Sequence, residues 1–288
     1  MASASGITLI SDNERNPLET TTYGVGEIIK DAINRGCKRF IIGIGGSATN
    51  DGGTGMLTAL GYEFLDKNNK PIALGAKGLN DLYRINIDNV IPQLKECSFN
   101  IACDVTNPLC GESGCSAVYG PQKGATPEMI KDMDEWLNNY AEIAKTVSAK
   151  ADKDYAGVGA AGGLGFAFLS FTNAVLKSGI EIVLEEINIE NDIETADIVV
   201  TGEGRLDSQT VMGKAPIGVA RLAKKYGKKV IAFSGCVTDE AEVCNEYGID
   251  AFFPILRGVT TLEEALDVRN AYKNLTATAC QVFRLIFK

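Results

Sequence analysis

Apolar and polar residues are distributed along the chain in patterns that predict short strands separated by helices. Apolar residues spaced three and four apart predict helices, at residues 25–33, 56–60, 127–147, 216–227 and 239–247. Short apolar runs bounded by glycine or polar residues predict strands, at residues 40–44, 62–65, 98–103, 197–201, 229–233 and 251–256. Strands that alternate with helices predict a parallel, doubly wound sheet, with ligands at the carboxyl ends of its strands.

The alternation becomes regular only after residue 190, and we place a domain boundary there. Residues 191–288 are predicted to form part of a Rossmann-like α/β domain, and residues 1–190 a second α/β domain with glycine-rich loops. Within the first part, the almost wholly apolar stretch 166–176 predicts a buried helix. Near the end of the chain, Thr260 and Glu263 match a capping box, so we expect the last helix to begin there.

A loop of glycines, small hydroxyls, an amide and a carboxylate follows the strand predicted at 40–44. Glycines such as Gly45 and Gly46 let backbone N–H groups approach a ligand, and successive N–H groups form a concavity that binds anions. The same loop contains Ser47 and Thr49 as hydrogen-bond donors and Asp51, which can hold a cation or take a proton. The pattern favours a small phosphate- or carboxylate-bearing guest, and the alternative is a glycine-rich turn without a ligand.

Acidic groups also follow two later strands. Asp104 and Asn107 come after the strand at 98–103, where the alternative is a turn carboxylate that accepts local backbone hydrogen bonds. The loop after the strand at 197–201 combines carboxylates with cations that can grip a phosphate or carboxylate, namely Glu203, Arg205, Asp207 and Lys214. The alternative for that loop is a solvated charged turn, but functional groups concentrate in such loops.

Two further glycine patterns leave alternatives open. Gly162 and Gly163 belong to a cluster at 157–165 that precedes an apolar helix, so the cluster either holds an anion at a helix N-terminus or allows close packing. Residues 43–48 fit the dinucleotide pattern Gly-x-Gly-x-x-Ala, which makes an NAD-linked oxidoreductase a rival interpretation. Residues 50–55 would, however, break the helix that must follow such a fingerprint.

Composition narrows the chemistry. The chain has 288 residues, a net charge of −9 and no histidine. The acidity argues against nucleic acid or a membrane surface as a partner, and the lack of histidine leaves Asp, Glu, Lys, Cys or Tyr as a general base. The eight cysteines contain no Cys-x-x-Cys pair, and no apolar run is long enough to span a bilayer. We therefore expect reduced thiols in a cytoplasmic protein. The acidic loops and glycine clusters together suit two reaction classes, namely metal-assisted phosphoryl transfer to a small anionic acceptor, or a dehydrogenase.

The chain resembles the type I glycerate kinases over essentially its whole length. The motifs that carry the resemblance are residues 21–24, 43–55, 103–109, 119–124, 157–165 and 201–216. The resemblance implies a two-domain α/β kinase that uses ATP and Mg²⁺ to phosphorylate D-glycerate, with 2-phosphoglycerate as the expected product.

Residue roles follow from this resemblance together with loop position and side-chain chemistry. The proposed catalytic residues are Asp104, Arg205 and Asp207. The proposed substrate- and phosphate-binding residues are Gly45, Gly46, Ser47, Thr49, Asn50, Asn107, Gly162, Gly163 and Lys214. The proposed metal ligands are Asp51 and Glu203.

The chain departs from the family at its beginning, because Asp-Ser-Phe-Lys-Gly-like and Asp-Gly-Gly-Glu-Gly-like turns are absent. It therefore resembles a member without its N-terminal segment, and the Rossmann-like domain is expected to be incomplete at its N-terminal side. We expect a weak or inactive kinase unless the missing part is supplied, as well as uncovered apolar surface that favours a homo-oligomer or a complementing N-terminal segment. A non-catalytic remnant that binds a small anion is the other alternative.

Overall fold

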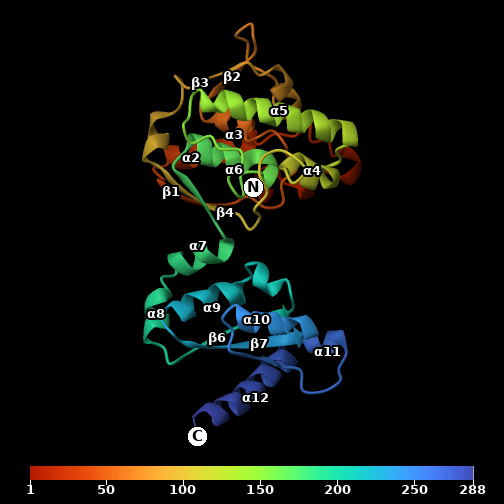
Figure 1. Ribbon diagram of the computed structural model, residues 1–288, viewed down its shortest axis with the longest axis vertical. Coiled ribbons are helices and arrows are strands. Elements are labelled where there is room, and N and C mark those ends of the chain that lie inside the picture. The colour runs from red at the N-terminus through yellow and green to blue at the C-terminus, as the bar shows by residue number, and fades with distance from the viewer. Residues whose placement is uncertain (288) are drawn as a thin grey trace. The chain divides into compact units, whose positions relative to one another are not determined.

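The computed structural model describes residues 1–287 and divides the chain into two compact units (Figure 1). The first unit is Met1–Gly179, and the second begins at Ile180. The sequence placed this boundary near residue 190. It lies earlier because helix α7 (Gly179–Glu186) already packs Leu184 into the hydrophobic core of the second unit.

The first unit combines short strands with helices of very different lengths. Its helices are α1 (Ala2–Ser5), α2 (Tyr23–Asn34), α3 (Thr54–Ala59), α4 (Cys115–Tyr119), α5 (Pro127–Lys145) and α6 (Ala160–Phe171). Its strands are β1 (Arg39–Gly43), β2 (Glu63–Leu65), β3 (Arg84–Asn86), β4 (Ser98–Ala102) and β5 (Ala174–Lys177).

The main sheet of the first unit has the strand order β1-β4-β5 and is parallel throughout. Alternate residues of β4 are buried, and the ring of Phe99 lies 5.8 Å from that of Phe168 on α6. Helix α5 joins the same core, because the ring of Tyr140 lies 5.3 Å from that of Phe166. Strands β2 and β3 form a separate antiparallel pair. The three parallel strands therefore end at one edge, with Gly43, Ala102 and Lys177 as their last residues.

One predicted helix is wrong in its second half. The sequence indicated a single helix over 166–176, but α6 ends at Phe171 and β5 begins at Ala174. Strand β5 pairs with β4, with Ala174 opposite Phe99. A short apolar run satisfies both helical and extended patterns, and the pairing with β4 decides between them here.

The second unit is a three-layer α/β arrangement. Its further elements are α8 (Glu190–Thr195), β6 (Ile198–Leu206), α9 (Ala215–Lys225), β7 (Lys229–Val237), α10 (Val243–Glu246), β8 (Ala251–Pro254), α11 (Leu262–Leu266) and α12 (Val268–Ile286). The strands form a parallel sheet in the order β6-β7-β8. Val230 and Ala232 of β7 face the core that contains α9, whereas Ile231 and Phe233 face Val282 of α12. Helices therefore cover both faces of the sheet, which confirms the doubly wound pattern (Figure 1).

Element boundaries in the second unit differ in places from the sequence prediction. Strand β6 continues to Leu206, where the sequence ended it at residue 201, because Glu203 and Arg205 still pair with Ser234 and Cys236 of β7. The capping box consists of Thr261 and Glu264, one residue later than predicted, and it begins the short helix α11. The last helix, α12, begins only at Val268, with Asp267 as its N-cap.

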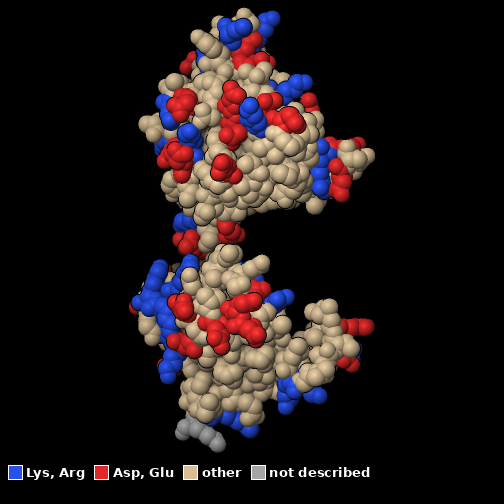
Figure 2. Space-filling model, turned by 45° about the vertical axis from the view of Figure 1, so that its right-hand side comes forward, with Lys and Arg blue, Asp and Glu red and all other residues tan. Residues whose placement is uncertain are grey.

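Acidic side chains are spread among basic ones on both units over the face shown in Figure 2. This distribution accords with the net charge of −9. None of the described helices is both long enough and apolar enough to cross a membrane.

Candidate functional site

The loop after β1 does not enter a helix directly. Gly52 and Gly53 have positive φ values of 63° and 78°, and α3 begins only at Thr54. The chain's first residues lie against this loop, where Ser47 forms a β-bridge with Gly6. The helix that a dinucleotide fingerprint requires therefore does not follow Gly45, as the sequence already indicated.

A cavity of about 360 Å³ lies at the carboxyl ends of β1 and β4. It brings together residues that the sequence had proposed separately: Gly45, Gly46 and Ser47 after β1, and Asp104 after β4. The remaining lining residues are Ile7, Ile44, Ala102, Cys103, Val105, Tyr119, Gln122, Lys123, Ala160 and Ala161. The cavity is thus built within the first unit, at the sheet edge where parallel α/β sheets bind ligands.

Asp104 is an exposed carboxylate at this cavity. Its Oδ1 accepts a hydrogen bond of 3.0 Å from the backbone N–H of Gly179, which follows β5. That bond fixes the carboxylate across the ends of β4 and β5. Because exposure leaves the group open to a ligand, Asp104 has the placement expected of a proton acceptor.

Lys123 also lines the cavity, although the sequence did not single it out as a site residue. It ends a short 3₁₀ turn, Pro121–Lys123, and its side chain is only 2% exposed. Its ammonium donates a hydrogen bond of 2.6 Å to the carbonyl oxygen of Thr49. Desolvation lowers the pKa of Lys123 to about 8, while Cys115 and Asp51 oppose that shift. The motif 119–124 pointed to this turn, but nothing in the sequence indicated that its lysine is buried.

Asp51 lies beneath the loop and not in the cavity. Its side chain is fully buried, and Oδ2 accepts hydrogen bonds from the N–H and hydroxyl of Thr22 at 2.8 and 2.9 Å. The N–H groups of Gly53 and Gly55 also donate to the carboxylate, at 3.1 and 3.3 Å. Burial raises the pKa of Asp51, and these donors lower it by a smaller amount. The geometry gives Asp51 the role of holding the loop to α2 and does not support the proposed metal ligand.

We expect Asp51→Asn to lower the unfolding free energy of the first unit by about 2–3 kcal/mol, because an amide NH₂ would face backbone donors in a buried site. Urea unfolding followed by Trp136 fluorescence measures this, since Trp136 is the only tryptophan and lies in α5. Asp132→Asn, at an exposed position of the same helix, is the control and should change stability by less than about 0.5 kcal/mol. If Asp51→Asn lowers the unfolding free energy only when a divalent metal is present, Asp51 is a metal ligand after all.

The other predicted binding residues of the first unit surround the cavity without lining it. Thr49 and Asn50 are buried, and Asn50 Nδ2 donates to Ser116 Oγ at 2.8 Å. Asn107 accepts a hydrogen bond of 2.6 Å from the Tyr119 hydroxyl and donates to the Ser113 carbonyl at 2.8 Å. These side chains tie the loops after β1 and β4 to α4.

Gly162 and Gly163 allow close packing, one of the two roles that the sequence left open. A Cβ on Gly162 would lie 2.1 Å from the carbonyl oxygen of Thr49, and one on Gly163 would lie 2.8 Å from Cα of Gly52. The N–H of Gly52 donates to the carbonyl of Gly162 at 2.9 Å. The glycine cluster therefore fits against the backbone of the loop after β1, and both Gly162 and Gly163 have positive φ.

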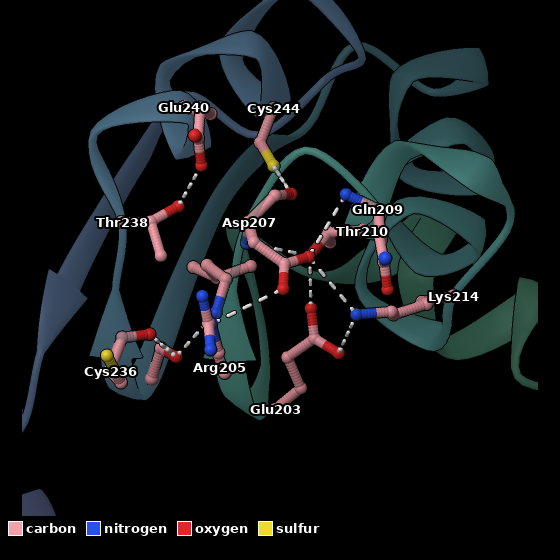
Figure 3. A network of polar contacts seen from close by, with 12 residues as sticks. Glu203, Arg205, Asp207, Gln209, Thr210, Lys214, Cys236, Thr238, Glu240 and Cys244 are labelled. Carbon is pink, nitrogen blue, oxygen red and sulfur yellow. Dashed lines mark hydrogen bonds and ion pairs between the residues drawn. The ribbon is translucent and has the colours of Figure 1, made fainter.

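The predicted charged residues of the second unit form one connected cluster (Figure 3). Lys214 Nζ lies 3.3 Å from Asp207 Oδ1 and 3.9 Å from Glu203 Oε2. Thr210 donates to Glu203 Oε1 at 2.6 Å, and Arg205 Nε lies 3.4 Å from Asp207 Oδ2. Desolvation raises the pKa of Asp207, but the hydrogen bond and charge of Lys214 and the charge of Arg205 outweigh it and leave the pKa below its ordinary value. Asp207 thereby orients both cations.

Comparisons with known proteins agree with one another over almost the whole chain. The model of the glycerate kinase family matches residues 1–287. A glycerate kinase of Haemophilus influenzae is 49% identical over 286 residues, which cover 99% of this chain and 75% of the relative. A glycerate 2-kinase of Escherichia coli K12 is 50% identical over 275 residues, or 96% of this chain and 72% of the relative.

The fold has a close counterpart among solved structures. A crystal structure from Salmonella typhimurium LT2, assigned as glycerate kinase 2, superposes with a TM-score of 0.82 at 45% identity. The match covers 97% of this chain and 75% of that chain.

Proposed function

Because the chain belongs to the glycerate kinase family, we propose that it transfers the γ-phosphoryl group of ATP to a hydroxyl group of D-glycerate. The observation that carries this proposal is the cavity at the ends of β1 and β4, which Ser47 and Asp104 line together. A volume of about 360 Å³ is at the lower end of the range of small-molecule sites, as suits a three-carbon acid.

Asp104 accepts the proton of the attacking hydroxyl in this proposal. The O–H bond of glycerate breaks as its oxygen forms a bond to the γ-phosphorus, and the bond from that phosphorus to the β,γ-bridging oxygen breaks to release ADP. The Asp104 carboxylate is suited to this step because it lies exposed at the cavity and accepts a hydrogen bond from the Gly179 N–H. Histidine is absent from the chain, so no imidazole competes for the role.

The loop after β1 contacts the substrate in this proposal. Ser47 donates a hydroxyl hydrogen bond, and a Cβ at Gly45 would meet no atom within 4 Å, so this position is open to a ligand. Thr49, Asn50, Asn107, Gly162 and Gly163 act indirectly by holding this loop and the loop after β4 in place.

Arg205 and Lys214 contact the phosphates of ATP in this proposal. The Arg205 side chain is 63% exposed, so its guanidinium is open to an anion despite its contact with Asp207. Lys214 supplies a second positive charge, and Asp207 is a positioning residue because it contacts both cations. Glu203 accepts a hydrogen bond from Thr210 and lies near Lys214, so it also helps to position that cation.

Magnesium is expected to arrive bound to ATP. Within residues 1–287, no group of three or more Asp, Glu, Cys or His side chains is arranged to hold a metal ion. The Asp51 carboxylate is enclosed by donors, and Glu203 faces Thr210 and Lys214. These residues do not fit a protein cage for Mg²⁺, whereas Mg²⁺ on nucleotide phosphates requires only one or two protein carboxylates.

Mixing the purified chain with ATP, Mg²⁺ and D-glycerate tests the proposed reaction. We expect ADP release that depends on D-glycerate, at a rate that also tests the expectation of a weak kinase, and no increase when glycerol replaces it at the same concentration. ADP release that D-glycerate does not raise above the ATP-only background would contradict the proposal.

The position of the new phosphoester is expected to be the 2-hydroxyl, as the name of the Escherichia coli relative suggests. Proton-coupled ³¹P spectra of the product distinguish the two outcomes. Phosphorus on the 2-oxygen couples to one methine proton and gives a doublet, whereas phosphorus on the 3-oxygen couples to two methylene protons and gives a triplet.

We also propose a cytoplasmic location. All eight cysteines are free thiols, and reducing compartments keep thiols in that state. Thiol titration of the freshly isolated native protein checks this, with eight reactive groups expected after denaturation.

A further inference from the structure

Lys123 is an unusual lysine because its whole side chain is buried. The one hydrogen bond of its ammonium goes to the neutral carbonyl of Thr49. Within residues 1–287, no carboxylate lies within ion-pair distance of Lys123. Asp51, the carboxylate whose charge acts on Lys123, directs its oxygens at Thr22, Gly53 and Gly55 instead.

A buried ammonium without an ion-pair partner is costly for a fold. Removing a charge from water destabilises the native state unless a counter-charge or several hydrogen bonds compensate. An ammonium carries three N–H donors, and the Thr49 carbonyl accepts from only one of them. The arrangement is therefore typical of a cation whose counter-charge is supplied by a ligand.

The cavity supplies the place for that ligand. Lys123 is the only lysine or arginine among the residues that line it, and Asp104 is the only carboxylate. A molecule with a carboxylate and a hydroxyl matches this pair of charges, because the carboxylate neutralises Lys123 while the hydroxyl contacts Asp104.

We propose that Lys123 binds the carboxylate of D-glycerate and makes the cavity selective for hydroxy acids over uncharged polyols. This inference rests on the proposed function and adds the residue that recognises the acid group. The turn that presents Lys123 is fixed from both sides. The Lys123 N–H donates to the Gly120 carbonyl, and Gly124 adopts a φ of 90° with no room for a Cβ beside the Arg15 carbonyl.

Calorimetric binding of D-glycerate to the full chain without ATP, compared with Lys123→Met, tests the inference. Methionine keeps the length of the side chain and removes the charge, so the affinity should fall roughly thirtyfold or more. Lys153→Met is the matched control, because Lys153 is only partly buried and donates to Asn138 on α5, away from the cavity lining. Its affinity for D-glycerate should equal that of the wild type.

A purely structural role predicts a different pattern. Replacing a buried, unpaired charge by an apolar side chain is expected to leave the first unit as stable as before, or more stable, in urea unfolding followed by Trp136. A structural lysine would instead lower stability. In kinetics, the KM for D-glycerate should rise while the KM for ATP stays unchanged.

Wild-type affinity should also weaken as the pH rises through about 8, where the Lys123 ammonium loses its proton. The titratable groups that act on Lys123 are Cys115 and Asp51, and Asp104, Cys103 and Tyr119 share its cavity. The pH dependence should vanish in Lys123→Met.

Three outcomes overturn the inference in different ways. If Lys123→Met binds D-glycerate as tightly as the wild type does, Lys123 does not bind the carboxylate, and the proposed function is unaffected. A lower kcat with unchanged glycerate affinity would place Lys123 at the transferred phosphoryl group instead. Failure of the wild type to bind D-glycerate would overturn the proposed function itself.

Discussion

Asp104→Asn is expected to lower the kcat for D-glycerate by about 10²–10⁴-fold, the usual contribution of a positioned proton acceptor. Asparagine has the same shape but cannot take the proton of the attacking hydroxyl. Its Oδ1 can still accept the hydrogen bond from the Gly179 N–H, so the ends of β4 and β5 should keep their arrangement. Steady-state ADP release at saturating ATP measures the effect, and the KM for D-glycerate should change little.

Asp134→Asn is the control for this substitution. Asp134 also accepts a backbone hydrogen bond, at 2.9 Å from the N–H of Gly111, but it does not line the cavity. Its kcat should equal that of the wild type. Near-normal turnover of a folded Asp104→Asn protein would show that another group takes the proton.

Gly162→Ala should lower the unfolding free energy of the first unit by about 3 kcal/mol or more, the sum of a left-handed backbone strain and an overpacked contact. The φ of Gly162 is +67°, and an added Cβ would lie 2.1 Å from the Thr49 carbonyl oxygen and 2.6 Å from Cα of Asn50. The same carbonyl accepts the hydrogen bond from Lys123, so D-glycerate binding should weaken too. Urea unfolding monitored by Trp136 measures the loss of stability.

Gly36→Ala separates the two causes of that loss. Gly36 has a φ of +91°, but no atom lies within 4 Å of an added Cβ. The substitution should therefore cost about 1 kcal/mol, the backbone contribution alone. Equal losses for the two variants would show that the loop after β1 yields to the added methyl group.

The sequence predicted the parallel sheet of the second unit because short apolar runs there alternate regularly with helices. It predicted the wrong structure at residues 174–176, since an apolar run permits both a helix and a strand until a partner is known. Pairing of Ala174 with Phe99 supplies that partner. The end of β6 was missed for the same reason, because polar residues such as Glu203 continue a strand when β7 offers backbone hydrogen bonds.

The candidate site was only partly predictable. Ser47 and Asp104 could be found because each follows a strand whose carboxyl end is a ligand-binding edge. Lys123 could not, because lysines are almost always exposed and no local pattern distinguishes a buried one. Asp51 has the chemistry of a metal ligand, but donors from Thr22, which is distant in sequence, enclose its carboxylate.

The proposed reaction depends most on D-glycerate occupying the cavity at the ends of β1 and β4. Cys103 lines that cavity, whereas Cys37 is an exposed thiol of the same unit and does not. Site-resolved mass spectrometry of thiol alkylation at neutral pH, with and without saturating D-glycerate, compares the two directly. We predict that D-glycerate slows the alkylation of Cys103 several-fold and leaves the rate at Cys37 unchanged. Unchanged rates at both cysteines would contradict the account.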